Sequence, residues 1–84
     1  MHRQQNIRRA ILDKLAGAEP YALPEDTLQT VVNAAIRPPM GQAEFDDALA
    51  FLQGQRFVRT MPDDLDPDLV KFLITESGKT LLLK

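Results

Sequence analysis

The clearest hydrophobic pattern of the chain lies between residues 41 and 53. Its apolar residues recur at positions i, i+3, i+4 and i+7, which is the spacing of one face of an α-helix. They are Phe45, Ala48, Leu49 and Leu52. Gly41 is acceptable at the N-cap of such a helix, and Gly54 can end it because glycine adopts the left-handed conformation at little cost. The pattern predicts a central helix over residues 41–53, with Leu49 and Leu52 in the core.

Two further helices are predicted before the central one. The first, over residues 4–16, is expected to stop at Gly17. The second, over residues 24–36, has Pro24 in its first turn and ends before a Pro-Pro pair, because the residue before a proline avoids the helical conformation. Leu12 lies off the apolar stripe of the first helix, and we interpret it as a second contact point. The two stripes consist of Ile7, Ala10, Ile11 and Leu15, and of Leu28, Val31, Val32, Ala35 and Ile36.

The second half of the chain carries strand and turn signals. Residues 56–61 and 69–74 predict two antiparallel strands, and the polar loop 62–68 between them completes a β-hairpin. Residues 21–23 predict a very short additional strand. Thr75 suits the N-cap of a last helix that runs to residue 83. Together the elements predict a mainly helical fold with a small β-hairpin, in the order α-(β)-α-α-β-β-α.

Length and composition favour a single domain over residues 1–84. The chain has no cysteine, so neither a disulfide nor a thiolate metal site is expected. No apolar run approaches the ~18–20 residues of a membrane span, and the polar N-terminus lacks the apolar region of a signal peptide. We therefore expect a cytoplasmic protein that needs no cofactor.

The net charge of −2 conceals an asymmetry along the chain. Residues 1–14 hold four basic groups and one acidic group, a balance of +3, so residues 15–84 carry −5. The acidic part includes the central helix and the hairpin loop, where polyanions should be repelled. Arg8 and Arg9 lie off the apolar stripe of the first helix, and exposure to solvent is the ordinary state of such charges.

The sequence offers no combination of residues suited to catalysis or metal binding. Three aspartates of the hairpin loop have the 1-3-5 spacing of a calcium loop, but Leu69 and Thr75 occupy the places where such a loop needs glycine and glutamate. His2 is the single histidine, which excludes a Cys/His or Ser/His/Asp triad in practice. The glycines are isolated, so they form no phosphate-binding loop. We expect no metal site and no enzymatic activity.

The order of the predicted elements resembles the winged helix-turn-helix arrangement. One feature that carries the resemblance is the helix that runs into a strand through Gly54. The other is the return over residues 72–82, which is similar to the "strand, Leu-Thr-x-x-Gly-x-x-Leu-Leu" ending of small bacterial winged-helix proteins. The resemblance covers nearly the whole chain. It implies that helices 24–36 and 41–53 form the helix-turn-helix pair, that 41–53 is the recognition helix for the major groove, and that 62–68 is the wing.

The charges at these two places depart from the pattern of the family. The exposed positions of helix 41–53 include no arginine or lysine, and the loop 62–68 carries four aspartates and no basic residue. DNA affinity depends heavily on the neutralisation of phosphates by Lys and Arg. The exposed positions are Gln42, Ala43, Asp46, Asp47, Ala50 and Gln53, with Glu44 alongside.

Two functions remain open on the sequence alone. The main hypothesis, favoured by the charge placement, is a non-catalytic module that binds another protein through an acidic helix face and wing. Its candidate contact residues are Asp46, Asp47, Phe51, Asp63 and Asp64. The alternative, favoured by the resemblance, is a small DNA-binding transcriptional regulator. Its candidate contact residues are Arg8, Arg9, Arg37, Gln42, Arg56 and Arg59.

Two local questions accompany these hypotheses. The arginines that flank the central helix would contact the DNA backbone, or they would pair with Asp46 and Asp47 inside the domain. The apolar C-terminal run exceeds what one helix face can bury, so it either frays or forms a homodimer surface. That run consists of Leu81, Leu82 and Leu83.

Overall fold

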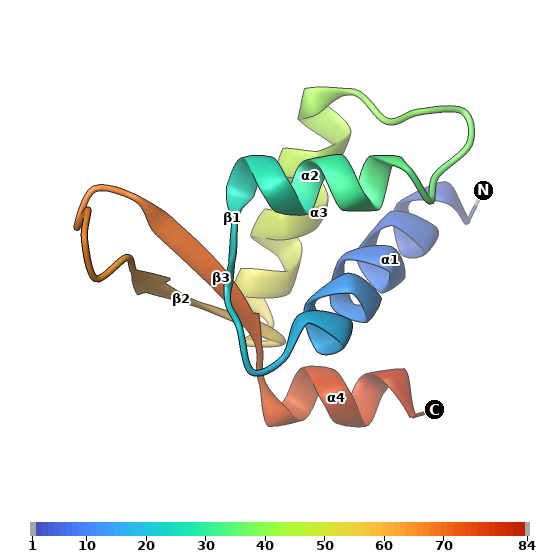
Figure 1. Cartoon of the computed structure of the whole chain (residues 1–84). Coiled ribbons are helices and arrows are strands. Elements are labelled where there is room, and N and C mark those ends of the chain that lie inside the picture. Colours follow the sequence, from blue (N-terminus) through green and yellow to red (C-terminus); the bar gives the residue numbers. More distant parts are fainter. Residues whose placement is uncertain (1, 84) are drawn as a thin grey trace.

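The computed structural model describes residues 2–83, and within them it shows four helices and a three-stranded sheet (Figure 1). Helix α1 packs against α2, α3 and α4, while the hairpin of β2 and β3 projects from the helical body. The fold is therefore mainly helical with a small antiparallel sheet, as predicted. The elements are α1 (Arg3–Ala18), β1 (Leu23–Pro24), α2 (Glu25–Asn33), α3 (Gln42–Gly54), β2 (Val58–Pro62), β3 (Val70–Ile74) and α4 (Glu76–Leu82).

Strand β3 lies in the centre of the sheet, whose order is β1-β3-β2. Both neighbours of β3 are antiparallel to it, with Leu23 opposite Phe72 on one side and Val58 opposite Ile74 on the other. The predicted hairpin is confirmed. The short strand expected over residues 21–23 forms two residues later, at Leu23–Pro24, because that is where the chain comes into register with β3.

The ends of two helices differ from the prediction. Helix α1 continues through Gly17 to Ala18, since no left-handed turn occurs at that glycine. Helix α2 ends at Asn33 instead of residue 36. After Asn33 the backbone hydrogen bonds join residues three apart instead of four, from Ala35 to Val32 and from Ile36 to Asn33. The side-chain oxygen of Asn33 accepts a hydrogen bond of 2.8 Å from the amide of Met40. Pro24 is the N-cap of α2 and not part of its first turn.

The start of β2 also differs from the prediction, at residue 58 instead of 56. Arg56 has a φ angle of 63°, which lies in the left-handed region. A residue in that conformation cannot continue an extended strand, so the chain turns between α3 and β2 before the ladder begins.

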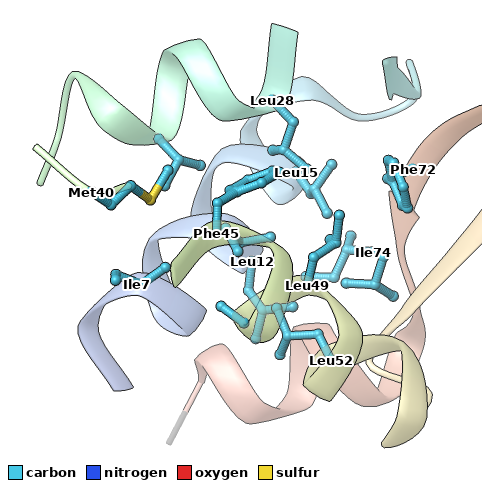
Figure 2. Packing of buried hydrophobic residues seen from close by; sticks show 14 of the residues in the cluster. Ile7, Leu12, Leu15, Leu28, Met40, Phe45, Leu49, Leu52, Phe72 and Ile74 are labelled. Atoms are coloured by element: carbon cyan, nitrogen blue, oxygen red, sulfur yellow. The ribbon is translucent and has the colours of Figure 1, made fainter. Parts of the chain in front are cut away.

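The core is a single cluster formed by one side of each helix and the inner face of the sheet (Figure 2). Leu49 and Leu52 are 4% and 1% exposed, so both are core residues as predicted. Leu12 is buried as well, which confirms it as a second contact point of α1. Figure 2 shows Phe45, which is fully buried, in the middle of the labelled side chains.

Thr75 joins the beginning of α4 to the turn after α3. Its hydroxyl donates a hydrogen bond of 2.7 Å to the carbonyl of Arg56 and accepts one of 3.2 Å from the amide of Gly78. The predicted N-cap is therefore confirmed, and the same side chain fixes the turn that positions the hairpin beside α3.

Candidate functional site

Helix α3 presents one long side to solvent, as the sequence predicts for a recognition-type helix. We call this side the α3 face. Gln42 and Asp46 lie one turn apart on it, and the amide nitrogen of Gln42 donates a hydrogen bond of 2.8 Å to Asp46 Oδ1. The face therefore exposes small residues, amides and carboxylates and no cation. It consists of Gln42, Ala43, Asp46, Asp47, Ala50 and Gln53, all of which are exposed.

The first turn of α3 is tied to the first turn of α1. Arg3 Nε lies 2.6 Å from Glu44 Oε2, and Arg3 also donates to the carbonyl of Pro39 at 3.3 Å. Glu44 accepts a further hydrogen bond of 3.1 Å from the amide of Gly41, which is the half of a capping box that the third residue of the helix supplies, since glycine has no side chain to form the other half. The hydrogen bonds from Arg3 and Gly41 lower the pKa of Glu44 from its ordinary value of 4.5 to about 2.

Glu44→Gln tests this contact through its pH dependence. Because the pKa of Glu44 is lowered in the folded state, its contribution is complete above pH 4.5 and is lost as the pH falls toward about 2. We expect the variant to be less stable than the wild type near neutral pH, and the difference to shrink in acid. Urea unfolding at several pH values measures it. A difference that stays constant down to pH 2 would contradict the assignment to Glu44 ionisation.

Three arginines stand around the ends of α3. Arg37 precedes the helix, and its guanidinium donates to the backbone carbonyls of Asn33 and Ile36 at 3.3 and 2.9 Å. Arg56 and Arg59 follow the helix and are exposed. Among residues 2–83, the ion pairs include none of these arginines and neither aspartate of the α3 face. The suggested pairing with Asp46 and Asp47 is therefore wrong.

The loop between β2 and β3 is held by one of its own aspartates. Asp63 Oδ1 lies 2.6 Å from the ammonium of Lys71, and its other oxygen accepts from the amides of Leu65 and Asp66 at 3.0 and 3.1 Å. These partners hold the pKa of Asp63 below its ordinary range. Of the two wing aspartates that the sequence offers as partner contacts, Asp63 is therefore used within the loop, whereas Asp64 is exposed.

Phe51, a candidate partner contact, is partly covered by α1. It is 38% exposed, and the guanidinium carbon of Arg8 lies 3.6 Å from the centre of its ring, a cation–π contact. Five helical positions separate Phe51 from Asp46, which places them about 140° apart around the axis of α3. Phe51 therefore points away from Asp46, whereas Asp47 lies one turn before Phe51 and only about 40° from it around the axis.

One basic residue of α1, Arg9, contacts the C-terminal helix. Arg9 donates to the carbonyl of Leu82 at 3.4 Å, next to the contact between Arg8 and Phe51. Leu81 and Leu82 are half-buried against the core, and Leu83 is 89% exposed. The C-terminal run therefore divides into two packed leucines and one free leucine.

Sequence reasoning missed the contact between Arg3 and Glu44. A local signal exists for one half of it, because a glutamate three residues after Gly41 is the spacing of a capping box. Nothing local points to Arg3, which lies 41 positions away in the chain. In the described residues there is no cluster of His, Cys, Asp and Glu that could hold a metal ion, and no helix there has the length and apolar character needed to cross a membrane.

Comparison with solved structures shows which fold this is. The PcaV transcriptional regulator from Streptomyces coelicolor superposes with a TM-score of 0.72 and 18% identity, over 90% of this chain and 48% of that chain. A MarR-family regulator from Silicibacter pomeroyi gives 0.71 and 22%, over 92% and 46%. F-93 of SSV1 gives 0.68 and 26%, over 90% and 78%. The chain thus spans about half the length of the first two proteins.

These likenesses establish the winged helix-turn-helix fold, as the sequence resemblance implied. The first two of these proteins are transcriptional regulators. No protein-family model matches the sequence, and comparison with curated proteins finds no match.

Proposed function

We propose that this chain is a non-catalytic, DNA-binding module of the transcriptional-regulator type, with α3 as its recognition helix and residues 62–68 as its wing. The observation that supports it most is the α3 face: an exposed helix side in the helix-turn-helix position, with exposed arginines before and after it in the chain. The regulators with the same fold support the same proposal. It reverses the order of the two hypotheses drawn from the sequence.

The residue types of the α3 face suit the edges of base pairs. Glutamine forms paired hydrogen bonds with adenine, and an aspartate accepts from the amino group of cytosine. Gln42 and Gln53 supply such amides, and Asp46 supplies a carboxylate. The methyl groups of Ala43 and Ala50 suit contact with thymine. The absence of cations on this face lowers affinity for any sequence, so selectivity would come from these contacts.

Phosphate contacts would come from the arginines around α3. Arg37, Arg56 and Arg59 are exposed and make no ion pair within residues 2–83. In this arrangement they would straddle the groove that receives α3, while the acidic wing stays away from the backbone. Binding would depend on few phosphate contacts and therefore show a shallow salt dependence.

Arg59→Gln tests the proposed phosphate contacts. We expect the variant to bind duplex DNA more weakly and to lower the slope of log affinity against log salt by about 1, because one phosphate contact is lost. Lys14→Gln is the matched control, since it removes one exposed charge from α1. Fluorescence anisotropy with a randomised duplex, and then with a selected sequence, measures both. Equal effects of the two variants, or no binding at low salt, would contradict the proposal.

The exposed acidic residues favour a second candidate function, in which the domain binds a basic protein surface. The observation that favours it is the exposure of Asp46, Asp47 and Asp64. The double variant Asp46→Asn and Asp47→Asn separates the two functions. If α3 enters DNA, it should raise affinity for non-specific duplexes, because two charges near phosphates disappear. If α3 binds a basic protein, DNA affinity should not change and association with that protein should slow.

A further inference from the structure

A groove runs between α1, the end of α3 and α4, and we call it the α1–α4 groove. Its volume is about 520 Å³. Apolar side chains from three elements make its floor and wall, and Arg8 and Arg9 stand on it. The apolar part consists of Leu12, Phe51, Leu52, Phe57 and Leu81. A groove of this composition suits an apolar side chain that arrives beside a negative charge.

Arg8 adds a more specific requirement. Its guanidinium lies over the ring of Phe51, which shields one edge of the group from water. Its Nε is buried and has no hydrogen-bond partner among the described residues. A buried donor without an acceptor is costly. The guanidinium of Arg8 also takes part in none of the ion pairs among the described residues, so a carboxylate brought by an occupant would meet a cation without an acidic partner.

The wing of the same chain has the complementary chemistry. Leu65 at its tip is 96% exposed, and it stands between Asp64 and Asp66. The tip has a fixed shape, because the amides of Leu65 and Asp66 both donate to Asp63, which is anchored to Lys71. A pre-ordered loop loses little freedom on binding. It therefore presents an apolar side chain, flanked by carboxylates, in one defined conformation.

We propose that the wing tip of one copy docks in the α1–α4 groove of a second copy, with Leu65 on the apolar floor and a neighbouring aspartate against Arg8. The charge asymmetry of the chain agrees with this contact, since residues 1–14 carry +3 and the remainder −5. The tip does not reach its own groove, because Figure 1 shows the hairpin projecting away from α1 and α4.

Such a contact is head to tail. Each copy has one tip and one groove, and the two surfaces differ, so the interface is heterologous and leaves a free tip and a free groove at the ends. One loop in one groove buries less area than a standard stable interface. Self-association is therefore weak and grows with concentration. It needs no DNA, so its failure would leave the proposed DNA-binding function untouched.

Sedimentation equilibrium of the 84-residue chain over the micromolar to millimolar range tests the proposal. We expect Leu65→Ser to weaken self-association about tenfold or more, because it removes the anchor. Leu83→Ser is the matched control, since Leu83 is 89% exposed and lies outside the groove lining. On the groove side, Arg8→Glu should have the same effect as Leu65→Ser. Arg9→Glu is a second groove variant, and thermal unfolding checks that each variant is folded.

Mixing the two kinds of variant decides between this contact and a symmetric dimer. The Leu65→Ser chain keeps its groove and the Arg8→Glu or Arg9→Glu chain keeps its tip. An equimolar mixture should therefore form 1:1 complexes and nothing larger, although neither variant associates alone. A wild type that stays monomeric at millimolar concentration would overturn the proposal. So would self-association that is lost in Leu83→Ser but kept in Leu65→Ser, or a mixture of folded variants that does not associate.

Discussion

Replacing Phe45 by alanine should remove about 3–5 kcal/mol from the free energy of unfolding, the usual range for a buried aromatic residue. Phe45 is fully buried at the centre of the cluster that joins α1, α2 and α3 (Figure 2). At ~0.05–0.15 kcal/mol per residue, a domain of this length has about 4–13 kcal/mol in total. The variant should therefore be strongly destabilised, with a much lower urea midpoint.

Phe51→Ala is the control for this prediction, since it makes the same change on the same helix. Phe51 is 38% exposed, so its truncation removes the contact with Arg8 and only part of the buried area that Phe45 would lose. A cation–π contact at a partly exposed site contributes about 0.5–1 kcal/mol, and with the partial burial the expected loss is about 1–2 kcal/mol. Urea denaturation of the two variants gives both values. Similar losses for Phe45 and Phe51 would show that the inner side of α3 has been assigned incorrectly.

Gly78→Ala should destabilise the domain, although alanine is the better helix former. In an open helical position the change would contribute about 1 kcal/mol in favour of folding. At Gly78, however, a Cβ atom would collide with the carbonyl oxygen of Phe57 and come within 2.7 Å of Ile74 Cγ1. The carbonyl is held in place by a hydrogen bond of 3.0 Å from the amide of Thr75. We expect a net loss of about 1–3 kcal/mol, the usual cost of overpacking.

Gly17→Ala provides the opposite case in the same protein. Gly17 lies within α1, and a Cβ atom there would meet nothing within 4 Å. The substitution should therefore stabilise the domain by about 0.5–1 kcal/mol. Thermal unfolding should move in opposite directions for the two variants. A stabilised Gly78→Ala would mean that α4 packs less closely on the turn after α3 than the structure shows.

The sequence predicted the fold correctly where apolar residues recur with helical spacing and are buried in the structure. The stripe of α3 predicted Leu49 and Leu52 in the core, and both are there. It was insufficient where the backbone changes direction. The left-handed conformation of Arg56 shortens β2, and no local pattern predicts it. The carbonyl of Arg56 accepts a hydrogen bond from Thr75, which lies 19 positions later in the chain.

The candidate site could be predicted only in part for a similar reason. Exposure of the α3 face follows from helical periodicity, so Gln42 and Asp46 were placed correctly. The partners of charged side chains depend on tertiary contacts, and the sequence does not contain them in local form. Arg3 with Glu44, Lys71 with Asp63 and Arg8 with Phe51 are all of this kind. The DNA contacts proposed for the α3 face and for Arg37, Arg56 and Arg59 stay predictions.

The position of β3 in the centre of the sheet has a consequence for solubility. Strand β2 covers one side of β3 over all five residues, and β1 covers the other side at Lys71 and Phe72, so the most apolar strand of the sheet lies in its centre. The outer edges of the sheet are those of β1, which has only two residues, and of β2. Pro62 at the end of β2 removes an amide donor, and the charge of Arg59 is unfavourable between stacked copies. The domain therefore keeps its most aggregation-prone strand away from the outer edges, where pairing with strands of other copies begins.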